Sequence, residues 1–104
     1  MDKPLVKNAA SRNQVKKAVR KERDERAEQI ADLKSVLRTA QGRRVMWRIL
    51  TECKTFNSIW EQSAKIHYNA GRQDLGHWLM AEIVDTDENR LFEMMKEHKE
   101  KTGE

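Results

Sequence analysis

The residues whose side chains most often carry out chemistry are few in this sequence and lie far apart. The chain of 104 residues has one cysteine and three histidines, at Cys53, His67, His77 and His98. Structural zinc sites use closely spaced pairs of cysteine and histidine, whereas these four residues stand singly. The sequence also lacks a phosphate-binding loop, a dinucleotide fingerprint and a nucleophile elbow. We therefore expect neither enzyme activity nor a bound metal or cofactor.

The N-terminal part of the sequence is strongly basic. Between positions 3 and 21 there is no acidic residue, and the seven basic residues are Lys3, Lys7, Arg12, Lys16, Lys17, Arg20 and Lys21. Such a run suits an arm that contacts phosphates or an acidic protein surface. A solvated, partly disordered tail is the alternative. We name the seven residues as candidate contacts with DNA or with a partner.

Two aromatic residues stand out in the segment 54–62, where the helical periodicity is broken. Its polar residues favour turns or caps, but Phe56, Ile59 and Trp60 are too apolar for a free linker. We expect the segment to fold back onto the helices. Phe56 and Trp60 are further candidate contacts with a partner.

Glycine and arginine form a second pattern. Gly71 and Gly76 lie in a segment that we expect to be helical, where each glycine costs about 1 kcal/mol relative to alanine. The two glycines predict that another segment of backbone packs closely against this helix. We expect Arg72, beside Gly71, to be a buried polar side chain. An arginine that follows a glycine, as in Gly71-Arg72 and Gly42-Arg43, can present its guanidinium group to a carboxylate or a phosphate. An ion pair within the chain is the alternative, with Asp74, Glu82 or Glu52.

The elements that would position these residues are helices. One proline and four glycines occur among many helix-forming residues, and the apolar spacing predicts helices over 11–40, 43–54, 63–84 and 87–99. Gly42 is expected to end the first helix, and Asp85 or Thr86 to cap the fourth. The predicted core face of the second helix consists of Val45, Met46, Ile49, Leu50 and Cys53.

We therefore predict an all-α fold, a small bundle of three to four helices with an extended basic N-terminal helix or arm. The arm would comprise residues 1–29, the helical domain 30–99 and a frayed tail 100–104. Hydrophobic residues make up 38% of the chain and charged residues 37%. A domain of this size has a modest core, so we expect a neighbouring molecule to complete it.

The sequence resembles a known family in three segments. These segments are residues 42–53, which begin with Gly42-Arg43-Arg44 and end at Cys53, residues 68–76, which begin with Tyr68-Asn69-Ala70-Gly71-Arg72 and end at Gly76, and Leu79 to Ile83. Together they are similar to a small helical family of tailed-phage proteins whose namesake comes from a short-tailed Bordetella phage. The resemblance covers residues 36–95. It implies a phage structural gene product, encoded among head and portal genes.

Two functions are compatible with these observations. The first is a virion structural component of a podovirus, present in multiple copies, either internal and involved in DNA ejection or associated with the portal. It would occur in the virion, and in the host cytoplasm during assembly, with portal or ejection proteins and packaged DNA as partners. The alternative is a non-virion nucleic-acid-binding, assembly or regulatory protein that uses the basic arm. No apolar run reaches the roughly 20 residues of a membrane span, and the apolar side of the arm is too thin for strong insertion, so we expect no membrane partner.

Overall fold

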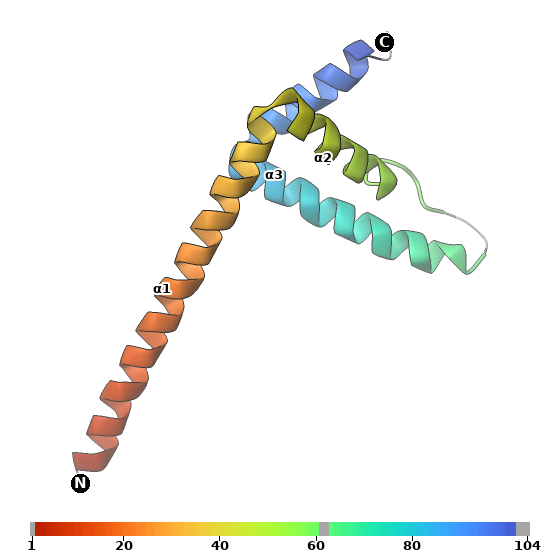
Figure 1. Cartoon of the computed structure of the whole chain (residues 1–104). Coiled ribbons are helices and arrows are strands. Elements are labelled where there is room, and N and C mark those ends of the chain that lie inside the picture. The colour runs from red at the N-terminus through yellow and green to blue at the C-terminus, as the bar shows by residue number, and fades with distance from the viewer. Residues whose placement is uncertain (1, 61–62, 102–104) are drawn as a thin grey trace.

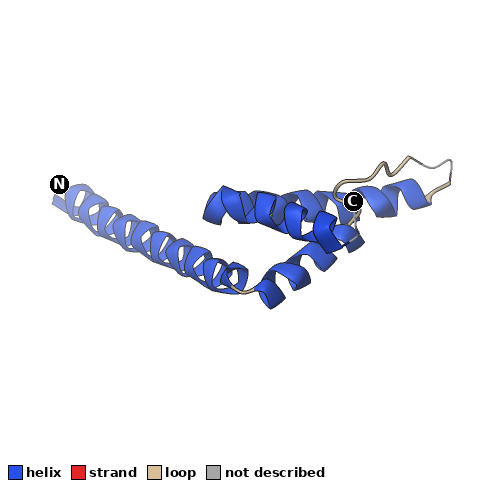
Figure 2. Ribbon diagram, turned by 90° about the horizontal axis from the view of Figure 1, so that it is seen from above, coloured by secondary structure: helices blue, strands red, loops and turns tan. Residues whose placement is uncertain are grey.

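The computed structural model describes residues 2–60 and 63–101, with side chains from residue 9 onward. Its elements are α1 (Asp2–Arg38), α2 (Ala40–Glu52) and α3 (Lys65–Lys101), shown in Figure 1. The described residues contain no strand, and the protein has an all-α fold (Figure 2). The side chains of Lys3 and Lys7, two of the predicted contacts, lie outside the described part.

Thr39 separates α1 from α2. Its backbone is extended, with φ −98° and ψ 148°, and its side-chain oxygen accepts a hydrogen bond of 3.0 Å from the Gly42 amide. This is the N-cap arrangement that starts a new helix. The prediction that Gly42 ends the first helix is therefore wrong. Gly42 lies in the first turn of α2, where a Cβ atom would come within 1.8 Å of the Val36 carbonyl oxygen.

Asp87 interrupts α3 close to the place where a fourth helix was predicted to begin. Its φ of −167° and ψ of 101° are extended, and its carboxylate accepts a hydrogen bond of 3.1 Å from the Asn89 amide. The predicted third and fourth helices are thus two segments of α3 joined by a kink. The kink lets residues on both sides of it face one core.

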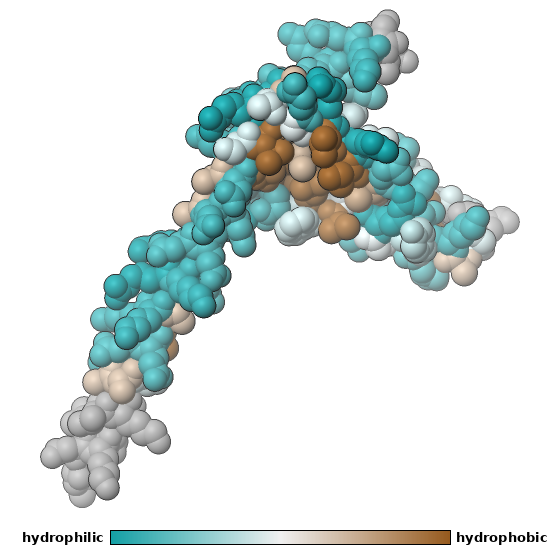
Figure 3. All heavy atoms as spheres, in the orientation of Figure 1, coloured by the Kyte–Doolittle hydropathy of each residue, from teal (hydrophilic) through white to brown (hydrophobic). Residues whose placement is uncertain are grey.

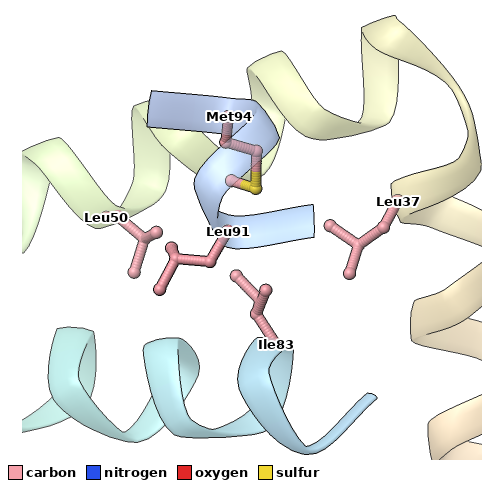
Figure 4. Close-up of a cluster of buried hydrophobic side chains, with 5 residues drawn as sticks. All are labelled: Leu37, Leu50, Ile83, Leu91 and Met94. Atoms are coloured by element: carbon pink, nitrogen blue, oxygen red, sulfur yellow. The ribbon is translucent and has the colours of Figure 1, made fainter. Parts of the chain in front are cut away.

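The core is a cluster of five buried side chains contributed by all three helices (Figure 4). Leu37 comes from α1, Leu50 from α2, and Ile83, Leu91 and Met94 from α3. Partly buried residues packed against this cluster include Leu33, Met46, Trp47, Leu79 and Met80. The cluster is small, as the composition predicts.

The molecule is elongated rather than round. Its principal extents are 74 × 38 × 16 Å and its radius of gyration is 20.7 Å, whereas a compact chain of this length has about 13 Å. The cause is α1, which leaves the other helices at an angle and runs away from them (Figure 1). Every residue from 9 to 25 is exposed.

Candidate functional site

Arg43 is a buried cation that joins the three helices. Its guanidinium group donates 2.9 Å and 3.1 Å hydrogen bonds to the carbonyl oxygens of Leu37 and Arg38, at the end of α1. It also contacts the carboxylates of Glu97, at 2.8 Å, and Glu93, at 3.4 Å, on α3. The carbonyl groups at a helix end have no partner within the helix, so Arg43 stabilises α1 and orients it against α3.

A second polar cluster fixes the turn after α2 against α3. Gln73 donates hydrogen bonds to the carbonyl oxygens of Lys54 and Asn57, at 2.9 Å and 2.8 Å, and His77 Nε2 donates to the Thr55 carbonyl oxygen at 3.0 Å. Arg72 donates to the backbone carbonyl of Glu52 and lies 3.8 Å from its carboxylate. The Glu52 carbonyl is one of those that the end of α2 leaves free, and the other three carbonyl groups belong to the turn that follows it.

The two glycines that were expected to mark a close backbone approach differ. A Cβ atom at Gly76 would lie 2.1 Å from Thr55 Oγ1 and 2.7 Å from Cys53 Cβ, so the turn packs directly on this glycine. At Gly71 a Cβ atom would meet nothing within 4 Å. The close approach that we predicted is therefore absent at Gly71, because the turn reaches α3 one and a half turns further along. Arg72 is only partly buried and pairs with Glu52, as the intramolecular alternative proposed.

Trp47 lies at the centre of an aromatic stack. Its ring centroid is 5.3 Å from that of Phe56 in the turn and 5.1 Å from that of His98 on α3. Its Nε1 atom is buried and has no hydrogen-bond partner among the described residues. Trp47 also lines a pocket of about 720 Å³ between α2 and the end of α3, together with Arg44, Arg48 and Lys101.

Two cations that line this pocket have no ion-pair partner among the described residues. Arg44 and Arg48 lie one turn apart on the exposed side of α2, and within the described part of the chain neither side chain forms an ion pair or a hydrogen bond. Glu52, the natural i+4 partner of Arg48, is instead engaged by Arg72. In contrast, Arg43, Arg72 and Arg90 all contact carboxylates.

Arg26 joins α1 to α3 just where α1 begins to leave the core. It lies 2.6 Å from the Glu82 carboxylate and 3.5 Å from that of Asp85. The hydrogen bond to Glu82 raises the pKa of Arg26, against the opposing effect of desolvation. The hydrogen bond from Arg90 to Glu93 raises the pKa of Arg90 in the same way. Both guanidinium groups therefore remain charged at any ordinary pH.

The predicted partner contacts occupy two separate regions. Arg12, Lys16, Lys17, Arg20 and Lys21 lie on the exposed part of α1, where Lys21 is 3.9 Å from Glu25. Phe56 and Trp60 are 45% and 70% exposed and lie in the loop at the far end of α2 (Figure 1). The structure does not bring the cations and the aromatic pair together.

Sequence reasoning missed the residues that hold the helices together. Arg43 was expected to present its guanidinium group to a carboxylate or a phosphate but not to join the helices, and the contacts of Arg26, Gln73 and His77 were not predicted. An arginine at an inward position of an amphipathic helix was the available signal for Arg43. For Gln73 there was no signal, because the carbonyl groups it binds lie 16 and 19 residues earlier in the chain.

The described residues contain no group of three or more side chains able to hold a metal ion. Among the same residues, no helix is long and apolar enough to span a membrane.

The comparisons with known proteins connect this arrangement to a phage family. Residues 33–96 match the family described as Bbp19-like phage protein. The comparisons with curated proteins and with solved structures gave no match. The matched range begins at Leu33 on the core side of α1 and ends beyond Met94, so it contains the whole core cluster. It also contains Arg43 and its partner Glu93, whereas Glu97 lies one residue beyond its end. The chain belongs to the Bbp19-like family of phage proteins.

Proposed function

We propose that this chain is a structural component of the virion of a short-tailed phage. It would be present in several copies and would pack against another phage protein, either at the portal or in the DNA-ejection apparatus. It would occur in the virion, and in the host cytoplasm while particles assemble. Membership of a phage family supports a phage-related role, and the exposed surface of the chain supports the packing role.

The observation that carries this proposal is the imbalance between exposed and buried apolar residues. Among the described side chains, six hydrophobic residues are buried, whereas thirteen large ones are exposed. Single exposed apolar residues are ordinary, but a gathering of them indicates an interaction surface. Figure 3 shows apolar surface where α1, α2 and α3 meet, and mostly hydrophilic surface along the rest of α1. Val36 of α1 and Val45 and Ile49 of α2 are among the exposed residues of these elements.

Quantitative mass spectrometry of purified virions tests the proposal. The chain should be present at several copies per particle, measured against the portal protein of the same preparation. A phage protein made only for DNA replication serves as the negative control. If the chain is as depleted from particles as that control, the proposal is wrong.

The exposed part of α1 favours one second candidate, which is nucleic-acid binding outside the virion. Residues 9–21 are all exposed and include five basic and no acidic residues. Binding that rests on such cations weakens steeply with salt, because each neutralised phosphate releases counterions. Titration of a DNA duplex at low and moderate salt, with the full chain and with a deletion of residues 1–26, tests this candidate. Equal affinity of the two proteins would exclude it.

A further inference from the structure

The side of α1 that faces the core also carries apolar residues in the exposed part of the helix, residues 9–25. Leu33 and Leu37 face the core, and an α-helix completes about five turns in 18 residues. Val15 and Val19 stand 18 residues before Leu33 and Leu37, so they lie on the same side of the helix. They are 59% and 58% exposed. Arg26 lies on this side two turns before Leu33 and pairs with Glu82 of α3. Beyond Arg26, the same side of the helix continues for about 16 Å to Val15 without a partner among the described residues.

The facing side of α3 also continues beyond the contact. Glu82 receives Arg26 of α1, and Trp78 and Leu75 lie about one and two turns before Glu82 on the same side of the helix. Trp78 is 58% and Leu75 is 57% exposed. The two helices diverge from their crossing (Figure 1). Each thus carries an unpartnered apolar face that begins at the contact between α1 and α3.

Charge distinguishes the kinds of partner that fit α1. Arg12, Lys16 and Arg23 lie along one edge of the Val15–Val19 face, about 40 to 80° from its centre. None of the three forms an ion pair within the described part of the chain. A nucleic acid would be attracted by these cations but would leave the valines in contact with a charged backbone. A helix with an apolar face and an acidic edge satisfies both features.

We propose that the exposed half of α1 binds an acidic amphipathic helix of another protein. Apolar side chains of that helix cover Val15 and Val19, and its carboxylates pair with Arg12, Lys16 and Arg23. Near the crossing, the same helix contacts Trp78 and Leu75 of α3. This inference rests on the proposed function, because it gives the chemistry of the surface that the chain would meet in the particle.

A synthetic helix tests the proposal on the purified full-length chain. The probe has about three heptads with leucine at the core positions and glutamate at the flanking positions, and binding is measured by calorimetry. A control peptide carries lysine at the flanking positions. We expect the acidic peptide to bind about tenfold or more tightly than the basic one. Absence of binding by the acidic peptide would overturn the proposal.

Matched variants locate the contact. V15S/V19S should weaken binding of the acidic peptide about tenfold, with the helical content of the chain unchanged by circular dichroism. R12E/K16E should also weaken it, whereas K17E/K21E makes the same change of charge on the opposite side of α1 and should leave affinity within about twofold. Equal losses in the two charge variants would overturn the proposal.

Two other occupants give distinct results. If a DNA duplex binds and the acidic peptide does not, the cations of the exposed half of α1 serve nucleic acid and the proposal fails. It also fails if the chain alone self-associates in sedimentation experiments and V15S/V19S abolishes the self-association, since the occupant is then a second copy. These results do not depend on virion composition, so failure here and failure of the proposed function are distinguishable.

Discussion

Gly71 and Gly76 both lie in the part of α3 before the kink. Only at Gly76 does another part of the chain pack against the glycine. Gly76→Ala should destabilise the protein by about 1–3 kcal/mol, because the new methyl group must displace Thr55 and Cys53. Gly71→Ala is the matched control, since its methyl group enters open space. It should be neutral or stabilising by up to about 1 kcal/mol. Urea unfolding of both variants measures the difference, and equal effects would contradict the packing described here.

Arg43 and Arg44 are adjacent residues with opposite surroundings. Arg43→Met should lower the free energy of unfolding by about 3 kcal/mol, because it leaves half-buried carboxylates and the last carbonyl groups of α1 without their partner. Arg44→Met removes an exposed cation whose side chain has no ion pair or hydrogen bond among the described residues, and the variant should stay within about 0.5 kcal/mol of the parent. Thermal and urea denaturation give both values. A loss at Arg44 as large as that at Arg43 would show that the polar contacts of Arg43 are not what stabilises the junction.

The behaviour of single residues was only partly predictable from the sequence. Burial of Cys53 and Leu50 follows from their spacing, and the pairing of Arg72 with Glu52 was one of the stated alternatives. In contrast, Val45 and Ile49 were predicted to lie in the core but are 54% and 40% exposed. The reason is that Arg43 occupies an inward position and rotates the buried face of α2 toward Leu50. A pattern of apolar residues alone does not reveal a buried arginine.

At the scale of the elements, the kink at Asp87 allows the parts of α3 on both sides of it to contribute side chains to the core, Ile83 from one and Leu91 and Met94 from the other. Asp87→Ala removes the carboxylate that accepts from the Asn89 amide and should cost about 1 kcal/mol of stability. Asp74→Ala, at an exposed position of the same helix, is the control and should be neutral or slightly stabilising. Chemical denaturation of the two variants provides the comparison. If both variants unfold alike, capping by Asp87 does not stabilise the kink.

The two halves of α1 should differ in stability. Residues 9–25 are exposed on all sides, whereas Leu33 and Leu37 are held by the core. A single helix without tertiary packing is marginal in water, so amide hydrogens of residues 9–25 should exchange about 100-fold faster than those near Leu37. Hydrogen exchange followed by mass spectrometry of the isolated chain measures this. Uniform protection along α1 would mean that its exposed half is already covered in solution.

The elements were more predictable than the contacts between them. The spacing of Leu33 and Leu37 identified the inward side of α1, and Asp87 lies where a new helix was expected. The boundary at Thr39 was missed because Gly42 was interpreted as a helix end, although its role is to leave room for the Val36 carbonyl oxygen. The angle at which α1 leaves the domain depends on Arg26, Glu82 and Arg43, which are distant in sequence. No local pattern predicts such an angle.

At the scale of the whole molecule, the extended shape and the small core have the same consequence. The chain has a radius of gyration of 20.7 Å, and thirteen of its described large apolar side chains are exposed to water when it is alone. Packing against another phage protein would remove that surface from water, at about 25 cal/mol for each Å² of apolar area. The buried Leu37, Leu50 and Met94 belong to the core of the domain, and the exposed faces are the surfaces that the proposed partner would cover.

Hydroxyl-radical footprinting of the chain in purified virions and in isolation tests this account most directly. Trp60, Trp78, Phe92 and Met95 are exposed in the isolated chain and should be readily oxidised there, but several of them should be protected in the particle. Met94, which is 2% exposed, is the internal control and should be protected in both samples. Equal oxidation of the exposed residues in the two samples would contradict the claim that a neighbouring phage protein completes this chain.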